Sequence, residues 1–504
     1  MHAGPFETDI APSGSLLGLL QRGRGDGALH ALAAPRPEAA AALDHCVRRD
    51  PRRDWRVEHR SLYYARLYVE LSADLDALDD HLAAHEDLSD PSSPRSDPTA
   101  SGGVAEERGE ERVGLAIAVL GHLSRYGDRR APTLLRRHIR SGAGRLWALD
   151  ELASCEDDET LRELGPAVLN GFPADQEGTI RLGIAMRDAW EPRPWRLWEE
   201  DPSRPAQGAL LREARRAADF DRWRRQLRPD TPRPDWSVAS VLARAARDLE
   251  ENPAGFRPDS AARCLAVVAG PDDRPVLRSV ARAGAPGERI AALRYLAERG
   301  DPAAPDLIAA AAAPDSPEDV ARAALLALTR MRGDDALARA RVWCAEEEPS
   351  GAPCSIGVAA GVLLARHGSG PDGPAVLEAL RRAVRRSEDP VTEMLLPDLV
   401  DGVGRLRPGG AAPLVRHLYR ETPSSLLRGR AAPALAATDP SFPAGFAVEC
   451  LWDCEQGTRE TAARFATTGD ARVVERLRRL AADPAEWDEV QTAVRGRLDG
   501  TPGR

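Results

Sequence analysis

The sequence contains no lysine, so all 69 basic residues are arginine, and asparagine occurs only at Asn170 and Asn252. Enzymes that form Schiff bases, P-loop nucleotidases and protein kinases all depend on a lysine amine. The sequence therefore excludes these classes. Its seven cysteines stand at scattered positions. That spacing predicts no disulfide framework and suits a reducing compartment.

Long apolar runs are also missing. No stretch of 18 apolar residues occurs, and no basic segment followed by an apolar one opens the chain. We therefore expect a soluble, cytoplasmic protein that does not enter a membrane. The formal net charge of −10 argues against a protein that coats nucleic acid non-specifically. A local basic groove remains compatible with it.

The pattern that is present is a repeat. An alanine- and leucine-rich helical segment, a Gly-Asp break and a second such segment recur along the chain. The breaks stand at Gly127-Asp128, Gly300-Asp301, Gly333-Asp334 and Gly469-Asp470, with looser versions between them. Self-similarity at about 30 to 40 residues is typical of stacked helical pairs. The sequence predicts an all-α fold, an α-solenoid of stacked, curved helical hairpins.

The clearest break has a simple local explanation. Gly300 can adopt the left-handed conformation that ends a helix, and Asp301 can cap the helix that follows. We expect Pro302 to occupy the first position of that helix, where its missing N–H costs nothing. Apolar residues then recur at helical spacing and predict one buried face in each unit: Ala304, Leu307, Ile308 and Ala311, then Ala321, Ala324, Leu325 and Leu328.

These units resemble HEAT-type repeats, especially the short variety of phycobilisome-lyase-like proteins, with an alanine-rich helix, Gly-Asp-Pro and a second helix. The resemblance covers residues 270–480 well and 114–170 less well. The opening stretch, with Trp55, Tyr63 and Tyr64, is similar to uncharacterised actinobacterial HEAT-repeat domain-containing proteins. The resemblance implies a fold and supplies no catalytic residues.

Composition divides the chain into five parts. We expect N-terminal helical repeats or a cap over 1–88, a flexible linker or long loop over 89–112, and HEAT-like repeats over 113–189. A Trp/Arg/Pro-rich insertion follows over 190–236, and a C-terminal HEAT-like solenoid over 237–504.

The insertion holds five of the ten tryptophans and seven prolines. Tryptophan and arginine most often anchor interfaces, and together they can stack bases or hold anionic groups. The alternative is that the tryptophans fill the junction between two solenoid halves. The candidate partner-binding residues here are Trp190, Arg193, Trp195, Arg196, Trp198, Arg222, Trp223, Arg224 and Arg225.

A second candidate is the basic, aromatic stretch over 48–68, which precedes an acidic helix. Its candidate partner-binding residues are Trp55, Tyr64 and Tyr68. Tyr64 and Tyr68 are four residues apart and share a helix face. A charged peptide or a nucleic acid could bind there. The alternative is an N-terminal cap whose arginines pair with Asp50 and other nearby acids.

Other motifs are weak. His81 and His85 share a helix face, but they lack the His-Glu-x-x-His order of zinc proteases. Cys450 and Cys454 have no second ligand pair nearby, which favours buried thiols. The Gly-rich match over 368–373 follows a repeat helix rather than a strand, so we interpret it as a turn. We expect no catalytic residues, no metal and no cofactor.

The sequence thus predicts a non-catalytic scaffold that binds another protein or peptide. Nucleic-acid binding through Arg/Trp surfaces is the alternative, which the acidic net charge disfavours. A lyase-related enzyme is suggested by repeat style alone. The partner, the oligomeric state and the face of the solenoid that binds are not encoded in any motif.

Overall fold

The structure is a computed structural model that describes residues 10–50, 59–85, 102–140, 142–226, 236–253, 256–346, 356–386 and 390–500. These residues form 28 α-helices and several short 3-10 helices, with no strand among them. The fold class predicted from the sequence, all-α, is confirmed. No helix of the described part is long and apolar enough to span a lipid bilayer.

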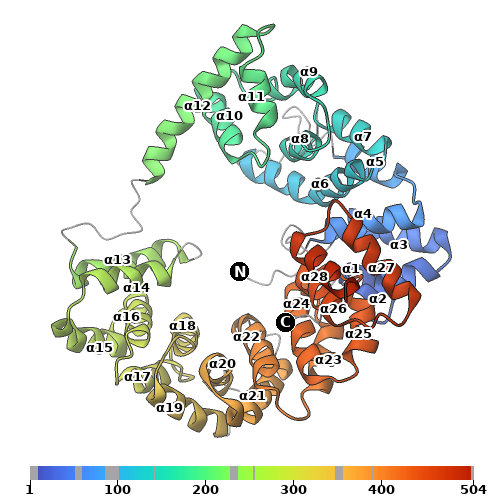
Figure 1. Ribbon diagram of the computed structural model, residues 1–504. Helices are drawn as coiled ribbons and strands as arrows, with labels where there is room; N and C mark the ends of the chain where they lie inside the picture. Colours follow the sequence, from blue (N-terminus) through green and yellow to red (C-terminus); the bar gives the residue numbers. More distant parts are fainter. Residues whose placement is uncertain are drawn as a thin grey trace. The chain divides into compact units, whose positions relative to one another are not determined.

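The described chain forms two compact units that do not follow the order of the sequence (Figure 1). Unit 1 comprises Arg228–Arg420 and Arg430–Pro440, and unit 2 comprises Gly4–Leu227, Glu421–Gly429 and Ser441–Arg504. The C-terminal helices therefore belong with the N-terminal half. This division differs from the five parts expected from composition.

In unit 1, every second helix along the chain packs on the one before it. α14, α16, α18, α20 and α22 contact one another in that order. α15, α17, α19 and α21 lie on one side of this row (Figure 1). The elements are α13 (Val238–Glu251), α14 (Pro258–Val268), η4 (Pro271–Asp273), α15 (Arg274–Ala283), α16 (Pro286–Glu298), α17 (Ala304–Ala311), α18 (Glu318–Leu328), α19 (Asp334–Ala345), α20 (Ile356–His367), η5 (Gly370–Asp372), α21 (Gly373–Arg385), α22 (Pro390–Leu406), α23 (Ala412–Glu421) and α24 (Ser425–Thr438). The first turn of α24, up to Gly429, belongs to unit 2.

The predicted break after α16 is present. Gly300 is left-handed with φ of +61°, and Asp301 accepts a hydrogen bond from the backbone N–H of Ala303. α17 begins at Ala304 with Ala303 as its N-cap, so the predictions that Asp301 caps this helix and that Pro302 is its first residue are wrong. The predicted apolar faces of α17 and α18 are buried. Gly127 and Gly333 are also left-handed, as glycine permits without a Cβ clash.

An Arg–Asp pair recurs at the turns of unit 1. Arginines on α15, α19 and α23 each reach a buried aspartate in the turn after the following helix of the row. The pairs are Arg278–Asp301 at 2.9 Å, Arg341–Asp372 at 2.7 Å and Arg416–Asp439 at 2.6 Å. Asp301 and Asp372 also accept hydrogen bonds from the backbone N–H groups of Ala303 and Ser369 in their turns. Each of these two pairs therefore fixes a turn against the helix beside it.

Unit 2 contains the remaining helices. Its centre is α6, which contacts α3, α4, α5, α7 and α8. α6 begins at Gly102, so the end of the segment expected as a linker is helical; residues 86–101 lie outside the described part. The elements are α1 (Leu16–Gln21), α2 (Gly25–Ala33), α3 (Arg36–Arg48), α4 (Arg60–Leu71), α5 (Asp76–Ala83), α6 (Gly102–Arg125), α7 (Arg130–His138), α8 (Arg145–Ala153), α9 (Asp158–Leu169), α10 (Gln176–Asp188), α11 (Arg193–Glu199), α12 (Pro205–Gln226), η6 (Phe442–Ala444), α25 (Phe446–Cys450), α26 (Gln456–Phe465), α27 (Ala471–Ala482) and α28 (Asp488–Leu498).

Candidate functional site: an ionic junction and an exposed tryptophan

Within unit 2, the first helices of the chain pack directly on the last ones. α2 contacts α25, and the backbone N–H of Cys454 donates a 2.9 Å hydrogen bond to the carbonyl oxygen of Gly23. A Cβ atom on Gly25 would lie 1.8 Å from the carbonyl oxygen of Glu449. Only glycine allows the two backbones to approach this closely. We call this region the junction, formed by α1, α2, α4, α6, residues 421–429 and α25–α28.

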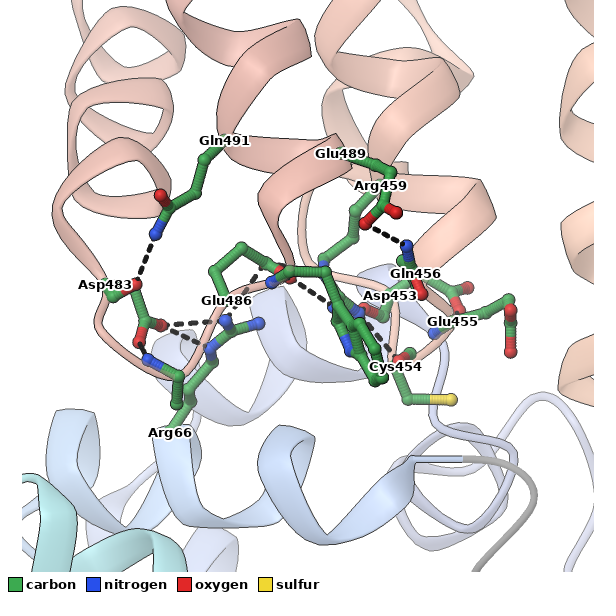
Figure 2. A network of polar contacts seen from close by, with 12 residues as sticks. Arg66, Asp453, Cys454, Glu455, Gln456, Arg459, Asp483, Glu486, Glu489 and Gln491 are labelled. Atoms are coloured by element: carbon green, nitrogen blue, oxygen red, sulfur yellow. Dashed lines mark hydrogen bonds and ion pairs between the residues drawn. The ribbon is translucent and has the colours of Figure 1, made fainter.

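A network of ion pairs links α4 to the turn between α27 and α28 (Figure 2). The Nε of Arg66 donates to Asp483 Oδ2 at 2.8 Å, and its Nη2 donates to Glu486 Oε2 at 3.0 Å. Arg459 of α26 binds the same Glu486 in a bidentate contact, from Nε at 2.9 Å and from Nη2 at 2.7 Å. One buried carboxylate is thus held by two arginines from distant parts of the sequence.

The network extends from Arg459 to the turn before α26 and to α24. Arg459 also donates to the carbonyl oxygens of Asp453 and Cys454, at 2.8 Å and 2.6 Å (Figure 2). The Asp453 carboxylate pairs in turn with Arg428 of α24 at 3.1 Å, and neither of these two side chains has any exposed surface. Charge-assisted, bidentate contacts of this kind fix geometry as well as adding stability.

Electrostatic interactions keep Glu486 and Arg66 ionised. Burial raises the pKa of Glu486, but Arg459 and Arg66 outweigh it and lower the pKa to about 2. Burial lowers the pKa of Arg66, but Glu486 and Asp483 outweigh it and raise the pKa above its ordinary value. Groups with such pKa values do not exchange protons near pH 7. The network holds the junction together and is not built for acid–base catalysis.

The tyrosines expected to bind a partner are buried at the same junction. The hydroxyl of Tyr64 donates to the carbonyl oxygen of Leu20 at 3.0 Å, and that of Tyr68 donates to Asp44 at 2.5 Å. Arg60 pairs with Asp50. These contacts match the alternative interpretation, an N-terminal cap whose arginines find local acids. Trp55 lies outside the described residues.

Two tryptophans of the predicted insertion are also core residues. Trp195 and Trp198 are 2% and 0% exposed, and their rings meet edge to face at 5.0 Å. The Nε1 of Trp198 donates to the carbonyl oxygen of Leu161 at 2.7 Å. Arg193, on the same helix, pairs with Asp158 at 2.9 Å. α11 therefore packs on α9 within unit 2, whereas the alternative drawn from the sequence placed these tryptophans between two solenoid halves.

Trp190 has the opposite environment: 91% of its surface is exposed. Its backbone is nevertheless fixed, because the Asp150 carboxylate accepts hydrogen bonds from the N–H groups of Trp190 and Glu191, both at 3.3 Å. Arg196, one turn into α11, is exposed as well. Arg222, Trp223, Arg224 and Arg225 fall on the last turns of α12, whose side chains there lie outside the described part.

One Ser/His pair merits a chemical test. Ser61 Oγ lies 3.3 Å from His122 Nε2, while Arg125 lies 3.1 Å from His122 Nδ1. A histidine that acts as general base needs an unprotonated Nε2, which requires a hydrogen-bond acceptor such as a carboxylate at Nδ1–H. Here the arginine can only donate to Nδ1, so Nε2 carries the proton. Burial, together with Arg125 and Arg66, also lowers the pKa of His122 to about 3. This geometry does not activate the serine.

The two weak metal-ligand motifs, His81/His85 and Cys450/Cys454, are not part of a larger ligand group in the described residues. The rings of His81 and His85 contact each other at 4.7 Å, and His85 Nδ1 lies 2.8 Å from the carbonyl oxygen of His81. Cys450 and Cys454 are buried. Within the described residues, no three His, Cys, Asp or Glu side chains are grouped so that they could hold a metal ion.

No pattern in the sequence predicts the junction pairs. Asp483 and Glu486 lie in a Pro-containing turn like other acidic turns of the chain, and Arg66 is one of several arginines in the stretch over 48–68. Comparison with protein families, curated proteins and solved structures finds no match to this chain. The case for a function therefore rests on the residues themselves.

Proposed function

We propose that the protein is a non-catalytic scaffold that binds another protein or a peptide, and that its helices form a HEAT-like α-solenoid. The serial packing of α14, α16, α18, α20 and α22, with a second layer beside them, supports the repeat architecture. So does the recurring Arg–Asp pair at the turns. Such arrays present extended surfaces and commonly act as binding platforms.

Trp190 is the observation that carries the binding proposal. A tryptophan side chain that is 91% exposed costs free energy in water, and its backbone is held in place by Asp150. Because the backbone is already held, less conformational freedom is lost when a partner covers this side chain than if the whole segment had to be ordered. Tryptophan and arginine are also the residues most enriched at binding hot spots. Trp190, together with the exposed Arg196 six residues further along the chain, forms the proposed anchor.

The test is affinity capture of the full-length protein from its native host, followed by mass spectrometry. Trp190→Ala should abolish a stoichiometric protein partner and leave the melting temperature unchanged. Val267→Ala is the control, because Val267 of α14 is an exposed apolar side chain, 73% accessible, in the other unit. Equal recovery with both variants would contradict the proposal. Recovery of nucleic acid released by salt would support the alternative function.

A further inference from the structure

The junction contains one arginine whose environment differs from that of the others. Arg476 of α27 is only 7% exposed, and its guanidinium carbon lies 3.7 Å from the centre of the Trp452 ring. Its Nε donates to the carbonyl oxygen of Leu451 at 3.2 Å. The cation is thus fixed flat on an indole face by a cation–π contact and one hydrogen bond.

Arg476 has no carboxylate within ion-pair distance among the described residues. Arg66, Arg428 and Arg459 in the same junction each bind one or two carboxylates. The terminal nitrogens of Arg476 have no hydrogen-bond partner in the described part, where only Nε donates, to Leu451. The outer edge of the guanidinium therefore carries unused N–H donors.

The surrounding charge favours an anion at this edge. Arg66 and Arg459 lie close enough to repel Arg476, and Glu486, one of the two acids that attract it, already binds both of them. Glu70 also contributes attraction, but it pairs with the exposed Arg479 at 2.9 Å. Burial, then Arg66 and Arg459, lower the pKa of Arg476 to about 9, so the group stays cationic at neutral pH.

We infer that Arg476 and Trp452 form a binding site for an oxyanion, the carboxylate or phosphate group of a small ligand. The planar guanidinium offers two parallel N–H groups, a geometry that matches both anions in a bidentate contact. A bound anion would supply the negative charge that Arg476 lacks and would reduce its repulsion with Arg66 and Arg459. The site is independent of the surface around Trp190.

The experiment is a thermal and calorimetric titration of the full-length protein with inorganic phosphate and, separately, with acetate, at constant ionic strength. The wild type should show saturable binding and a rise in Tm with at least one of the two anions, since a ligand of the native state stabilises it. Whether phosphate or acetate binds shows whether the site takes a phosphate group or a carboxylate. Arg476→Met should weaken binding at least tenfold.

Arg472→Met is the matched control, because Arg472 lies on the same helix but is 92% exposed and pairs with Asp470 at the start of that helix. It should bind the anion as the wild type does. If Arg476→Met does not fold, Arg476→Lys keeps the charge and removes the bidentate edge, so binding should still fall. Equal binding by the Arg476 and Arg472 variants, or no saturable effect of either anion on the wild type, would overturn the inference.

Discussion

Arg66 and Glu486 are 420 residues apart in the sequence, and their side chains meet at 3.0 Å. Asp483 and Arg459 complete the contact. In an array whose helices contact only near neighbours, such a pair would not form. Unit 2 departs from that rule, because its first helices and its last ones share one buried ionic network. The stability of α4 therefore depends on α27 and α28.

Replacing Arg66 by Met should destabilise the protein by about 3 kcal/mol, because Asp483 and Glu486 would be left buried beside one partner fewer. Chemical denaturation of the full chain gives the free energy of unfolding. The control is Arg479→Met, whose ion pair with Glu70 also joins α27 to α4 but is partly exposed. Its loss should cost less than about 1 kcal/mol. Equal losses would show that burial does not govern this junction.

Acid should weaken the junction through Glu486. Its folded-state pKa of about 2 lies below the ordinary value of 4.5, so its stabilisation is complete above pH 4.5 and is lost as the pH falls through 2. Between pH 6 and pH 3, wild type should lose about 2 kcal/mol more than Glu486→Gln, which has no proton to gain. Urea denaturation at each pH measures the difference. Parallel curves for the two proteins would contradict this.

A single methyl group should disturb the close approach of the two backbones. In Gly25→Ala the new Cβ would overlap the carbonyl of Glu449, which we expect to cost about 3 kcal/mol. Gly496→Ala is the comparison, since nothing lies within 4 Å of its added Cβ in α28. That change should be neutral or stabilise by up to about 1 kcal/mol. Thermal unfolding followed by circular dichroism distinguishes the two.

The tryptophans around α11 should separate into two classes. Trp198→Ala removes a buried ring and its hydrogen bond to Leu161, and should cost about 3 to 5 kcal/mol. Trp190→Ala removes an exposed ring and should change the free energy of unfolding by less than about 0.5 kcal/mol. Similar losses for both variants would mean that the ring of Trp190 also contributes to folding.

The features that sequence reasoning predicted well are local. The left-handed Gly300 and the buried faces of α17 and α18 each depend on a few neighbouring residues. Backbone conformation and helical periodicity are determined by residues that are close together in the sequence. The helical class of the fold follows from them.

The features that the sequence did not reveal depend on distant contacts. Trp190, Trp195 and Trp198 occur within nine positions, and nothing near them in the sequence distinguishes the exposed one from the two that fill the core. That difference arises from Asp150 and Leu161, on α8 and α9. The partners of Arg66 lie still further away, beyond any spacing that a motif can encode.

The junction also has a consequence for synthesis. At the usual translation rate of about 5 to 20 residues per second, α4 leaves the ribosome roughly 20 to 80 s before Glu486 is made. During this interval Arg66 faces water rather than Asp483 and Glu486. We expect this charged side chain to remain hydrated and to disfavour premature association of α4 until the last helices are made.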